Sequence, residues 1–442
     1  MMKARGLLAA VIVLAALAGA LYWSNRKQKA AAAKSTTTTA TKILNIPQDQ
    51  ITGITIQKTG AEATVLQKGA DGKWEITEPK PLRADQDAVK SLASTLADLN
   101  ADALVEKKTT DLAAYGLTAP TLRVTVQEKD GKSQNVLVGD NTPTGGDAYA
   151  ALAGNPSVYT VYSYVKTSLD KTSDDLRDKR LLTFDQDKLT RVDLQPAKGE
   201  AIEFGKDNQN DWEILKPRPL RADGSQVEDL IRRLREAKMD STISPEDAKK
   251  AAAAFASGTP VATAAVTDAN GTEKLEVRKD KDKNYYAKSS AVPGVYKVTA
   301  DLGDGLTKNL DDFRNKKLFD FGWTDPNKIQ FGKTTIEKSG EKWMSGGKEM
   351  DAASVQNLVD KLRDLTSIKF LDTGGGSPVV DITVTSNNNK RVEKVSITKQ
   401  GDQYLAKREN EPSIYELDGK VVADLQKAAS DVKVAAPPKK KK

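Results

Sequence analysis

The chain has 442 residues, enough for two to four domains of about 100–200 residues each. Residues 1–42 hold seven basic residues and no acid, and residues 439–442 add four lysines, so the body between them has a net charge near −4. A mildly acidic body argues against binding to duplex nucleic acid, because neutralised phosphates supply most of that affinity. The sequence has no Cys and no His, which excludes disulfides, thiol nucleophiles, imidazole catalysis and Cys- or His-based metal sites.

An apolar run occupies residues 6–23, behind a basic n-region at residues 1–5. At 1.5 Å per residue, this run is long enough to cross a hydrocarbon core of about 30 Å, and we expect a retained transmembrane signal anchor. Tyr22 and Trp23 stand where an interfacial aromatic belt would lie. A cleaved signal peptide is the alternative, because Ala18-Gly19-Ala20 offers a small-residue cleavage site.

The anchor predicts a location for the rest of the chain. Basic residues flank both ends of the run, so the positive-inside rule does not decide its orientation. We expect a single-pass protein of the inner (cytoplasmic) membrane whose body is periplasmic or extracytoplasmic. Residues 24–42 read as a flexible stalk and residues 437–442 as a disordered basic tail.

The body contains an internal repeat. Residues 74–85 read WEITEPKPLRAD and residues 212–223 read WEILKPRPLRAD, with nine identical positions in twelve at an offset of 138 residues. Apolar residues follow both segments at the same offsets from the final Asp, and again after Asp351, where they predict one amphipathic helix per copy. These residues are Val89, Leu92, Leu96 and Leu99; Val227, Leu230, Leu234 and Ala237; and Val355, Leu358, Leu362 and Leu365.

The second half of each copy also repeats. Strand-like segments surround paired tyrosines, and the first two copies then share DDLRDKRL (174–181) and DDFRNKKL (311–318). The third copy lacks Pro-Leu-Arg and this closing element. These patterns predict three tandem modules at 43–184, 185–321 and 322–436, the last of them degenerate or capping.

Within each module, short alternating strands and hairpins outnumber helices. In the first copy Leu122, Val124 and Val126 alternate, Asp130-Gly131 turns the chain, and a returning strand follows. We therefore expect an α+β fold, with antiparallel sheets and helices packed on them.

The repeated W-E-I-x-x-P-x-P-L-R-A-D segment, the helix after it, the Asp-Asp-Leu/Phe-Arg element and the apolar N-terminus together give a resemblance. The chain resembles bacterial proteins of the domain-of-unknown-function family 4340. The resemblance implies a membrane-anchored protein in an extracytoplasmic accessory role, in some cases beside ABC-transporter components related to gliding-motility auxiliary proteins. It supplies no catalytic residues.

Two sets of repeated residues have structural interpretations. Asp85, Asp223 and Asp351 precede the three helices, where a carboxylate accepts hydrogen bonds from free backbone N–H groups. Trp74, Trp212 and Trp343 stand in strands beside those helices. We expect core packing for them, and exposed platforms for sugars or peptides are the alternative.

The basic residues of the repeat are the candidate interaction residues. Arg83 and Arg221 lie between a Pro-rich turn and a helix start, where they can form an ion pair or bind a carboxylate or phosphate. Two matched clusters can pair with nearby Asp residues or dock a protein or an anionic lipid. They are Arg177, Lys179 and Arg180, and Arg314, Lys316 and Lys317.

No motif predicts a catalytic, cofactor or metal site, and we expect no cofactor. The sequence favours a non-enzymatic scaffold or accessory protein, with the membrane bound through residues 6–23 and a protein partner in an envelope or transporter complex. Binding of cell-wall or surface glycan through Trp and Tyr side chains is the first alternative. A hydrolase using only carboxylates is the second, and it requires two acids that converge in one pocket.

Overall fold

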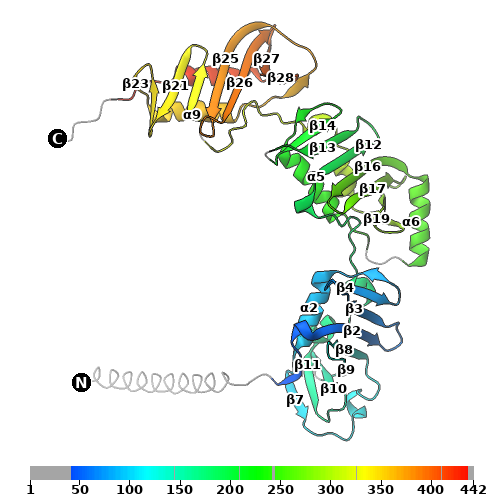
Figure 1. Ribbon diagram of the computed structural model, residues 1–442. Helices are drawn as coiled ribbons and strands as arrows, with labels where there is room; N and C mark the ends of the chain where they lie inside the picture. Colours follow the sequence, from blue (N-terminus) through cyan, green and yellow to red (C-terminus); the bar gives the residue numbers. More distant parts are fainter. Residues whose placement is uncertain are drawn as a thin grey trace, which may run out of the picture. The chain divides into compact units, whose positions relative to one another are not determined.

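The computed structural model describes residues 41–143, 145–208, 210–240, 244–324, 326–409 and 411–436. The chain divides into two compact units, Met1–Lys179 and Arg180–Lys442. The first unit contains one large sheet, and the second contains two (Figure 1). Every strand pair in these sheets is antiparallel, so the α+β prediction is confirmed.

The three sheets share one order over eight strands, and the second sheet lacks the ninth strand of the other two. They run β5-β4-β3-β2-β8-β9-β10-β11-β7, then β15-β14-β13-β12-β16-β17-β18-β19, and then β23-β22-β21-β20-β25-β26-β27-β28-β24. The central register also repeats, because Ile54 pairs with Val126, Val192 with Val266 and Ile329 with Val384. The internal repeat of the sequence is therefore a repeat of topology.

The first sheet is built from residues 51–162, and a small ladder of β1 with β6 lies beside it. The elements are β1 (Lys42–Asn45), η1 (Gln48–Gln50), β2 (Ile51–Lys58), β3 (Thr64–Lys68), β4 (Trp74–Glu78), β5 (Leu82–Arg83), α2 (Gln86–Ala97), β6 (Asp98–Asn100), β7 (Ala103–Glu106), η2 (Ala113–Tyr115), β8 (Leu122–Glu128), β9 (Ser133–Asn141), β10 (Asp147–Leu152), β11 (Val158–Tyr162), α3 (Ser163–Leu169) and α4 (Ser173–Leu176).

The second sheet has eight strands, and α6 packs against β18 and β19 at its edge. The elements are η3 (Gln186–Lys188), β12 (Arg191–Pro196), β13 (Ile202–Lys206), β14 (Trp212–Lys216), β15 (Leu220–Arg221), α5 (Gly224–Glu236), α6 (Pro245–Ser257), β16 (Thr259–Asp268), β17 (Gly271–Lys279), β18 (Tyr285–Ser289), β19 (Val295–Val298), α7 (Ala300–Gly305) and α8 (Leu310–Phe313).

The third sheet again has nine strands, and α9 and α10 pack against each other beside it. The elements are β20 (Lys328–Phe331), β21 (Thr334–Ser339), β22 (Lys342–Ser345), β23 (Lys348–Glu349), α9 (Ala352–Arg363), β24 (Lys369–Leu371), β25 (Ser377–Ser386), β26 (Arg391–Gln400), β27 (Gln403–Arg408), β28 (Ile414–Leu417) and α10 (Gly419–Ser430).

One amphipathic helix packs on each sheet, as the spacing predicts. Val89, Leu92 and Leu96 of α2 are buried in the first core, and the matching residues of α5 and α9 are buried in the second and third. Each helix starts after a capping Asp. Asp85 accepts hydrogen bonds from two backbone N–H groups, as does Asp223, and Asp351 accepts one from Ser354. Such a cap contributes about 1 kcal/mol.

Side chains in and just after the closing segments 174–181 and 311–318 pack in two successive cores. Leu176 is buried in the first core and Phe313 in the second. Leu181, Leu182 and Phe184 are buried in the second core, and Leu318, Phe319 and Phe321 in the third. The sequence boundaries put 181–184 and 318–321 at the ends of modules, whereas these side chains pack in the core of the module that follows.

In the third module, a different segment accepts the hydrogen bond from the backbone N–H of the capping Asp. The amide of Asp85 donates to Leu176 O, and that of Asp223 donates to Phe313 O. The third copy lacks the closing element, yet the amide of Asp351 donates to Lys433 O, and Met350 forms a β-bridge with Val434. Residues that follow α10 therefore supply the same backbone contact without the sequence motif.

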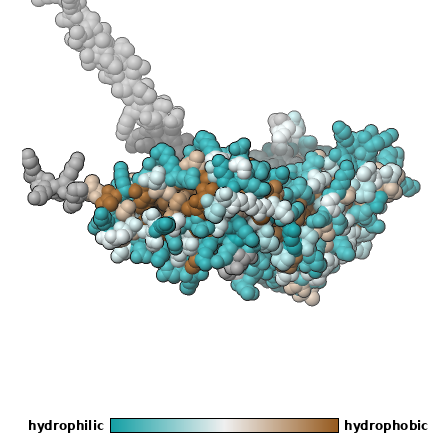
Figure 2. Space-filling view, turned by 90° about the horizontal axis from the view of Figure 1, so that it is seen from above, coloured by the Kyte–Doolittle hydropathy of each residue, from teal (hydrophilic) through white to brown (hydrophobic). Residues whose placement is uncertain are grey.

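The expected anchor at 6–23 lies outside the described residues. In the part of the chain that is described, no helix is long and apolar enough to cross a membrane. The face seen in Figure 2 is mostly hydrophilic, with one band of hydrophobic residues and a few others scattered outside it.

Candidate functional site

Arg221 is the centre of a charged cluster in the second unit. The residue ends β15, a two-residue edge strand that pairs with β14. Its guanidinium reaches residues that pack in or beside the third core. It donates to Asp320 Oδ2, to Lys317 O at 2.5 Å and to the hydroxyl of Tyr415 at 3.0 Å. Its Nε lies 2.7 Å from Glu411 Oε1, as an ion pair without hydrogen-bond geometry.

Arg408, at the end of β27, is the second guanidinium of the cluster. Its Nε donates to Glu411 Oε1 at 2.7 Å, and its Nη2 donates to Glu393 Oε1 at 3.1 Å. Its Nη1 donates to Leu318 O. Glu411 thus lies between two guanidinium groups that come from different modules.

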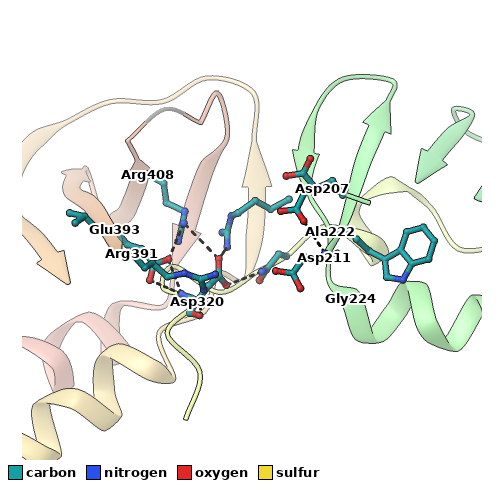
Figure 3. Close-up of a pocket in the computed structure, with 13 residues that line it drawn as sticks. Asp207, Asp211, Ala222, Gly224, Asp320, Arg391, Glu393 and Arg408 are labelled. Carbon is teal, nitrogen blue, oxygen red and sulfur yellow. Dashed lines mark hydrogen bonds and ion pairs between the residues drawn. The ribbon is translucent and has the colours of Figure 1, made fainter. Parts of the chain in front are cut away.

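Asp320, in the segment between α8 and β20, forms ion pairs with both guanidinium groups. Its side chain accepts from Arg221 and, at 3.0 Å, from the side-chain Nδ2 of Asn315. Its backbone N–H donates to Glu393 at 2.9 Å, and its carbonyl accepts from Arg391 at 2.5 Å. Figure 3 shows Arg408, Arg391 and Glu393 converging on Asp320.

Burial and pairing shift the pKa values in this cluster in opposing ways. Burial alone lowers the pKa of Arg221, but the carboxylates of Asp320 and Glu411 offset this effect, and the net pKa is raised. Burial raises the pKa of Glu393, although the Asp320 N–H and Arg408 favour its charged form. Burial also raises the pKa of Tyr415. The cluster is a set of mutually dependent charges, so removing one partner leaves another partly buried and unpaired.

An open cleft of about 500 Å³ adjoins the cluster. Asp207 and Asp211 lie on its other side, at the end of the β13–β14 hairpin (Figure 3). Glu213 lines it too, and burial together with Asp207 and Asp211 raises the pKa of Glu213. Five carboxylates and three guanidiniums line the cleft, so it is acidic overall and can accept a positively charged group.

Arg314 makes a second contact between the same two modules. Its side chain is only 6% exposed. The guanidinium donates to Ser413 Oγ at 2.8 Å and lies 3.5 Å from the ring centroid of Phe370, as a cation–π contact. Its remaining partner is Asp311, three residues earlier, at 2.9 Å. This predicted interaction residue therefore joins the second module to the third.

The other predicted interaction residues take different positions. Arg83 is exposed at the end of β5. Arg177 and Lys179 both pair with Asp174, at 2.8 Å and 3.4 Å, which is the pairing within the segment that the sequence allowed. Arg180 forms a backbone bridge with Lys238. Lys316 and Lys317 are exposed, and Lys317 forms a backbone bridge with Thr366.

The three repeated tryptophans are buried. Trp74 is 7% exposed, Trp212 is 8% exposed and Trp343 is 6% exposed. A lysine ammonium lies over each ring, and Trp212 Nε1 donates to Glu228 at 2.6 Å. They belong to the cores, as core packing predicts.

Sequence reasoning identified Arg221 but missed its partners. Asp320, Glu393, Arg408, Glu411 and Tyr415 come from segments up to 194 residues away. Aligning the copies would have given one signal, because Thr183 and Ser289 occupy the positions of Asp320 and Arg408. Charge therefore appears in the third copy at sites that are neutral in the second.

Among the described residues, no group of three or more acidic side chains could hold a metal ion. The carboxylates of the cleft lie beside guanidinium groups or along one hairpin.

Comparison with known proteins gives the family. The model of the family described as "Domain of unknown function (DUF4340)" matches residues 74–252 and 212–384. Both matches begin at a repeated tryptophan and run beyond the closing segment of that copy into the next module. Searches of curated proteins and of solved structures found no match. Because the two matches together cover more than half of the sequence, the chain belongs to the DUF4340 family, which it contains in tandem.

Proposed function

We propose that this protein is a non-enzymatic, membrane-anchored scaffold whose modules present surfaces to a protein partner. The body would be extracytoplasmic, and the partner would be part of a transporter or envelope complex. Residues 6–23 would hold the protein in the inner membrane. The family resemblance and the apolar N-terminus support the location, and the packing of the second unit supports the scaffold role.

The scaffold role is supported by the contacts that two arginines of the second module make with residues of the third. Arg221 contacts Asp320, Glu411 and Tyr415, and Arg314 contacts Ser413 and Phe370. Such contacts fix one module against the next, because the directional bonds of a guanidinium specify geometry more strongly than apolar contact does. Two modules held in this way present one continuous surface to a partner.

The glycan-binding alternative depends on exposed aromatic faces. Trp74, Trp212 and Trp343 are buried and each ring faces a lysine ammonium, so these side chains offer no stacking surface. Trp323, Tyr162 and Tyr164 are exposed, so we favour a protein partner on the charged contacts between the modules and not on the burial of aromatic rings.

Crosslinking of the full-length protein in its native membrane tests the scaffold role. We expect mass spectrometry to identify a specific envelope or transporter protein with the wild type. Combining Arg221→Ala with Arg314→Ala should reduce its recovery, because the two modules then lose their fixed relation. Arg83→Ala, a change at an exposed side chain, is the matched control. If the wild type crosslinks to nothing above background, the scaffold proposal is wrong.

Thiol labelling tests the location, since the natural chain has no Cys. The variant Lys281→Cys places one thiol on an exposed turn of the second module. We expect a membrane-impermeant maleimide to label it in intact spheroplasts, while Ala4→Cys reacts only after lysis. The reverse pattern would place the body in the cytoplasm.

A further inference from the structure

A second cleft, of about 410 Å³, lies on the basic side of the junction between the second and third modules. Lys316, Lys317 and Arg363 line it, together with Gly322. Trp323 follows Gly322, and its ring lies 5.2 Å from the guanidinium carbon of Arg363. We call this site the Trp323 cleft.

The acids that line this cleft are already engaged. Asp223 accepts the first backbone N–H groups of α5. Asp320 accepts from Arg221 and Asn315. Within the described chain, the ammonium groups of Lys316 and Lys317 form no ion pair. Their counterpart Lys179 differs, because it pairs with Asp174 at 3.4 Å.

Trp323 is 90% exposed, unlike the three repeated tryptophans. Gln186 occupies the matching position after the first closing segment, and it accepts from Arg235 at 2.6 Å. Arg235 corresponds to Arg363 on the next copy of the helix. A polar pair in one copy is thus an exposed indole over a guanidinium in the other. Trp is among the side chains that most often dominate protein–protein interfaces, and Trp323 is exposed, whereas Arg363 is mostly buried beneath it.

We propose that the Trp323 cleft binds an acidic segment of a partner protein, which deepens the scaffold role and rests on it. Lys316 and Lys317 would pair with its carboxylates, and Trp323 would pack on a neighbouring side chain. Arg363 is already paired with Asp360, and a concave site with two further lysine ammonium groups suits a few carboxylates on one chain. A lipid surface requires a broader basic face and would repel the acidic body around it.

Fluorescein-labelled hexaglutamate is the probe, and the full-length protein in neutral-lipid nanodiscs is the receptor. Fluorescence anisotropy should show binding to the wild type. The double variant Lys316→Glu with Lys317→Glu should weaken binding about tenfold or more, because two attractive charges become repulsive. Trp323→Gln introduces the residue of the other copy and should weaken binding several-fold with unchanged folding, since the indole is exposed.

The matched control is Lys281→Glu with Lys283→Glu, two exposed lysines on the β17–β18 turn. It changes the net charge by the same amount and should leave binding unchanged. Equal losses in both double variants, or no binding by the wild type, would overturn the proposal. It would also be overturned if phosphatidylglycerol vesicles, and not the peptide, bound in a way that depended on Lys316 and Lys317.

Native-membrane crosslinking separates this inference from the scaffold role. A partner that crosslinks equally well to wild type and to the Lys316/Lys317 variant would keep the scaffold and remove the cleft as its docking site. Peptide binding to the cleft without any crosslinked partner would remove the scaffold role itself.

Discussion

The segments 174–186 and 311–323 have similar sequences and the same backbone contacts, but they meet different charges. In both, an amide after the edge strand donates to Leu176 O or Phe313 O. The amides of Leu181 and Leu318 then donate to Ala237 O and Leu365 O, at the same point after the helix. The shared apolar residues therefore set one backbone arrangement twice.

The difference lies in a few side chains. Thr183 donates to Glu273 through both its amide and its hydroxyl, whereas Asp320 at the matching position donates only its amide to Glu393 and uses its carboxylate for Arg221. Ser289 donates to Leu181 O where Arg408 donates to Leu318 O. A repeated backbone thus acquired a charged junction at its second occurrence, without any change of strand order.

The largest expected effect concerns the shared apolar position of the closing segments. Phe313→Ala should destabilise the second unit by about 3–5 kcal/mol, because Phe313 is fully buried against Phe204. Leu176→Ala should destabilise only the first unit, by about 2–5 kcal/mol. Hydrogen exchange during urea unfolding measures both. An effect of Phe313→Ala on the first unit alone would contradict the division of the cores.

The charged junction gives the next effect. Arg221→Ala should cost about 3 kcal/mol, because it leaves Asp320 and Glu411 partly buried without a partner. Arg83→Ala, on the equivalent strand, should cost less than about 1 kcal/mol because this side chain is exposed. Urea denaturation measures the loss in free energy of unfolding for each variant. Equal losses would contradict the difference between the two segments.

The helix caps should behave alike in both units. Asp85→Ala and Asp223→Ala should each cost about 1 kcal/mol, since each carboxylate accepts from the second and third N–H of its helix. Thermal unfolding of the single variants measures the costs. A markedly larger cost for Asp223→Ala would mean that this residue, which also lines the Trp323 cleft, has a further structural role.

The smallest expected effect is a difference in acid sensitivity between α5 and α2. Hydrogen bonds from Arg233, Arg232 and Lys308 lower the pKa of Asp229 below its ordinary value, and the helix of the first unit has Ser91 at that position. A lowered pKa stabilises the folded state above about pH 4, and this contribution disappears as the pH falls further. It should stay under about 1 kcal/mol because the carboxylate is partly exposed.

The measurement for Asp229 is thermal unfolding of the wild type and of Asp229→Asn between pH 6 and about pH 2. The stability advantage of the wild type should shrink as the pH falls. A constant advantage across this range would show that the Asp229 charge does not contribute.

The local structure could be read from the sequence, because its signals are local. The spacing of Val89, Leu92 and Leu96 predicts α2, Asp85 predicts the cap, and Asp130-Gly131 predicts the turn between β8 and β9. All three are confirmed. Three such patterns at matching offsets were enough to predict three similar sheets.

The junction could not be read in the same way, because its contacts join residues far apart in the sequence. Arg408 and Glu411 are three residues apart, but nothing local to them indicates that Arg408 also contacts Glu393 or that Glu411 also contacts Arg221. The β-bridge of Met350 with Val434 was missed because backbone atoms form it, so it requires no particular side chain. Backbone contacts do not require particular side chains, so they produce no sequence motif. Long-range charge pairs become visible in the sequence only when copies of a repeat are compared.

Because β4 and β14 pair with their neighbouring strands in the same register, the chain could continue from one module into the other at this point. Ile76 pairs with Leu66 and Ile214 with Phe204, at the same step after the tryptophan. A chain without residues 75–212 would join Trp74 to Glu213 in the same ladder position, with an unbroken strand and the same turn into a helix. A tandem array of this kind can lose or gain one whole module in a single recombination event, and every helix cap and hairpin of the remaining modules is kept.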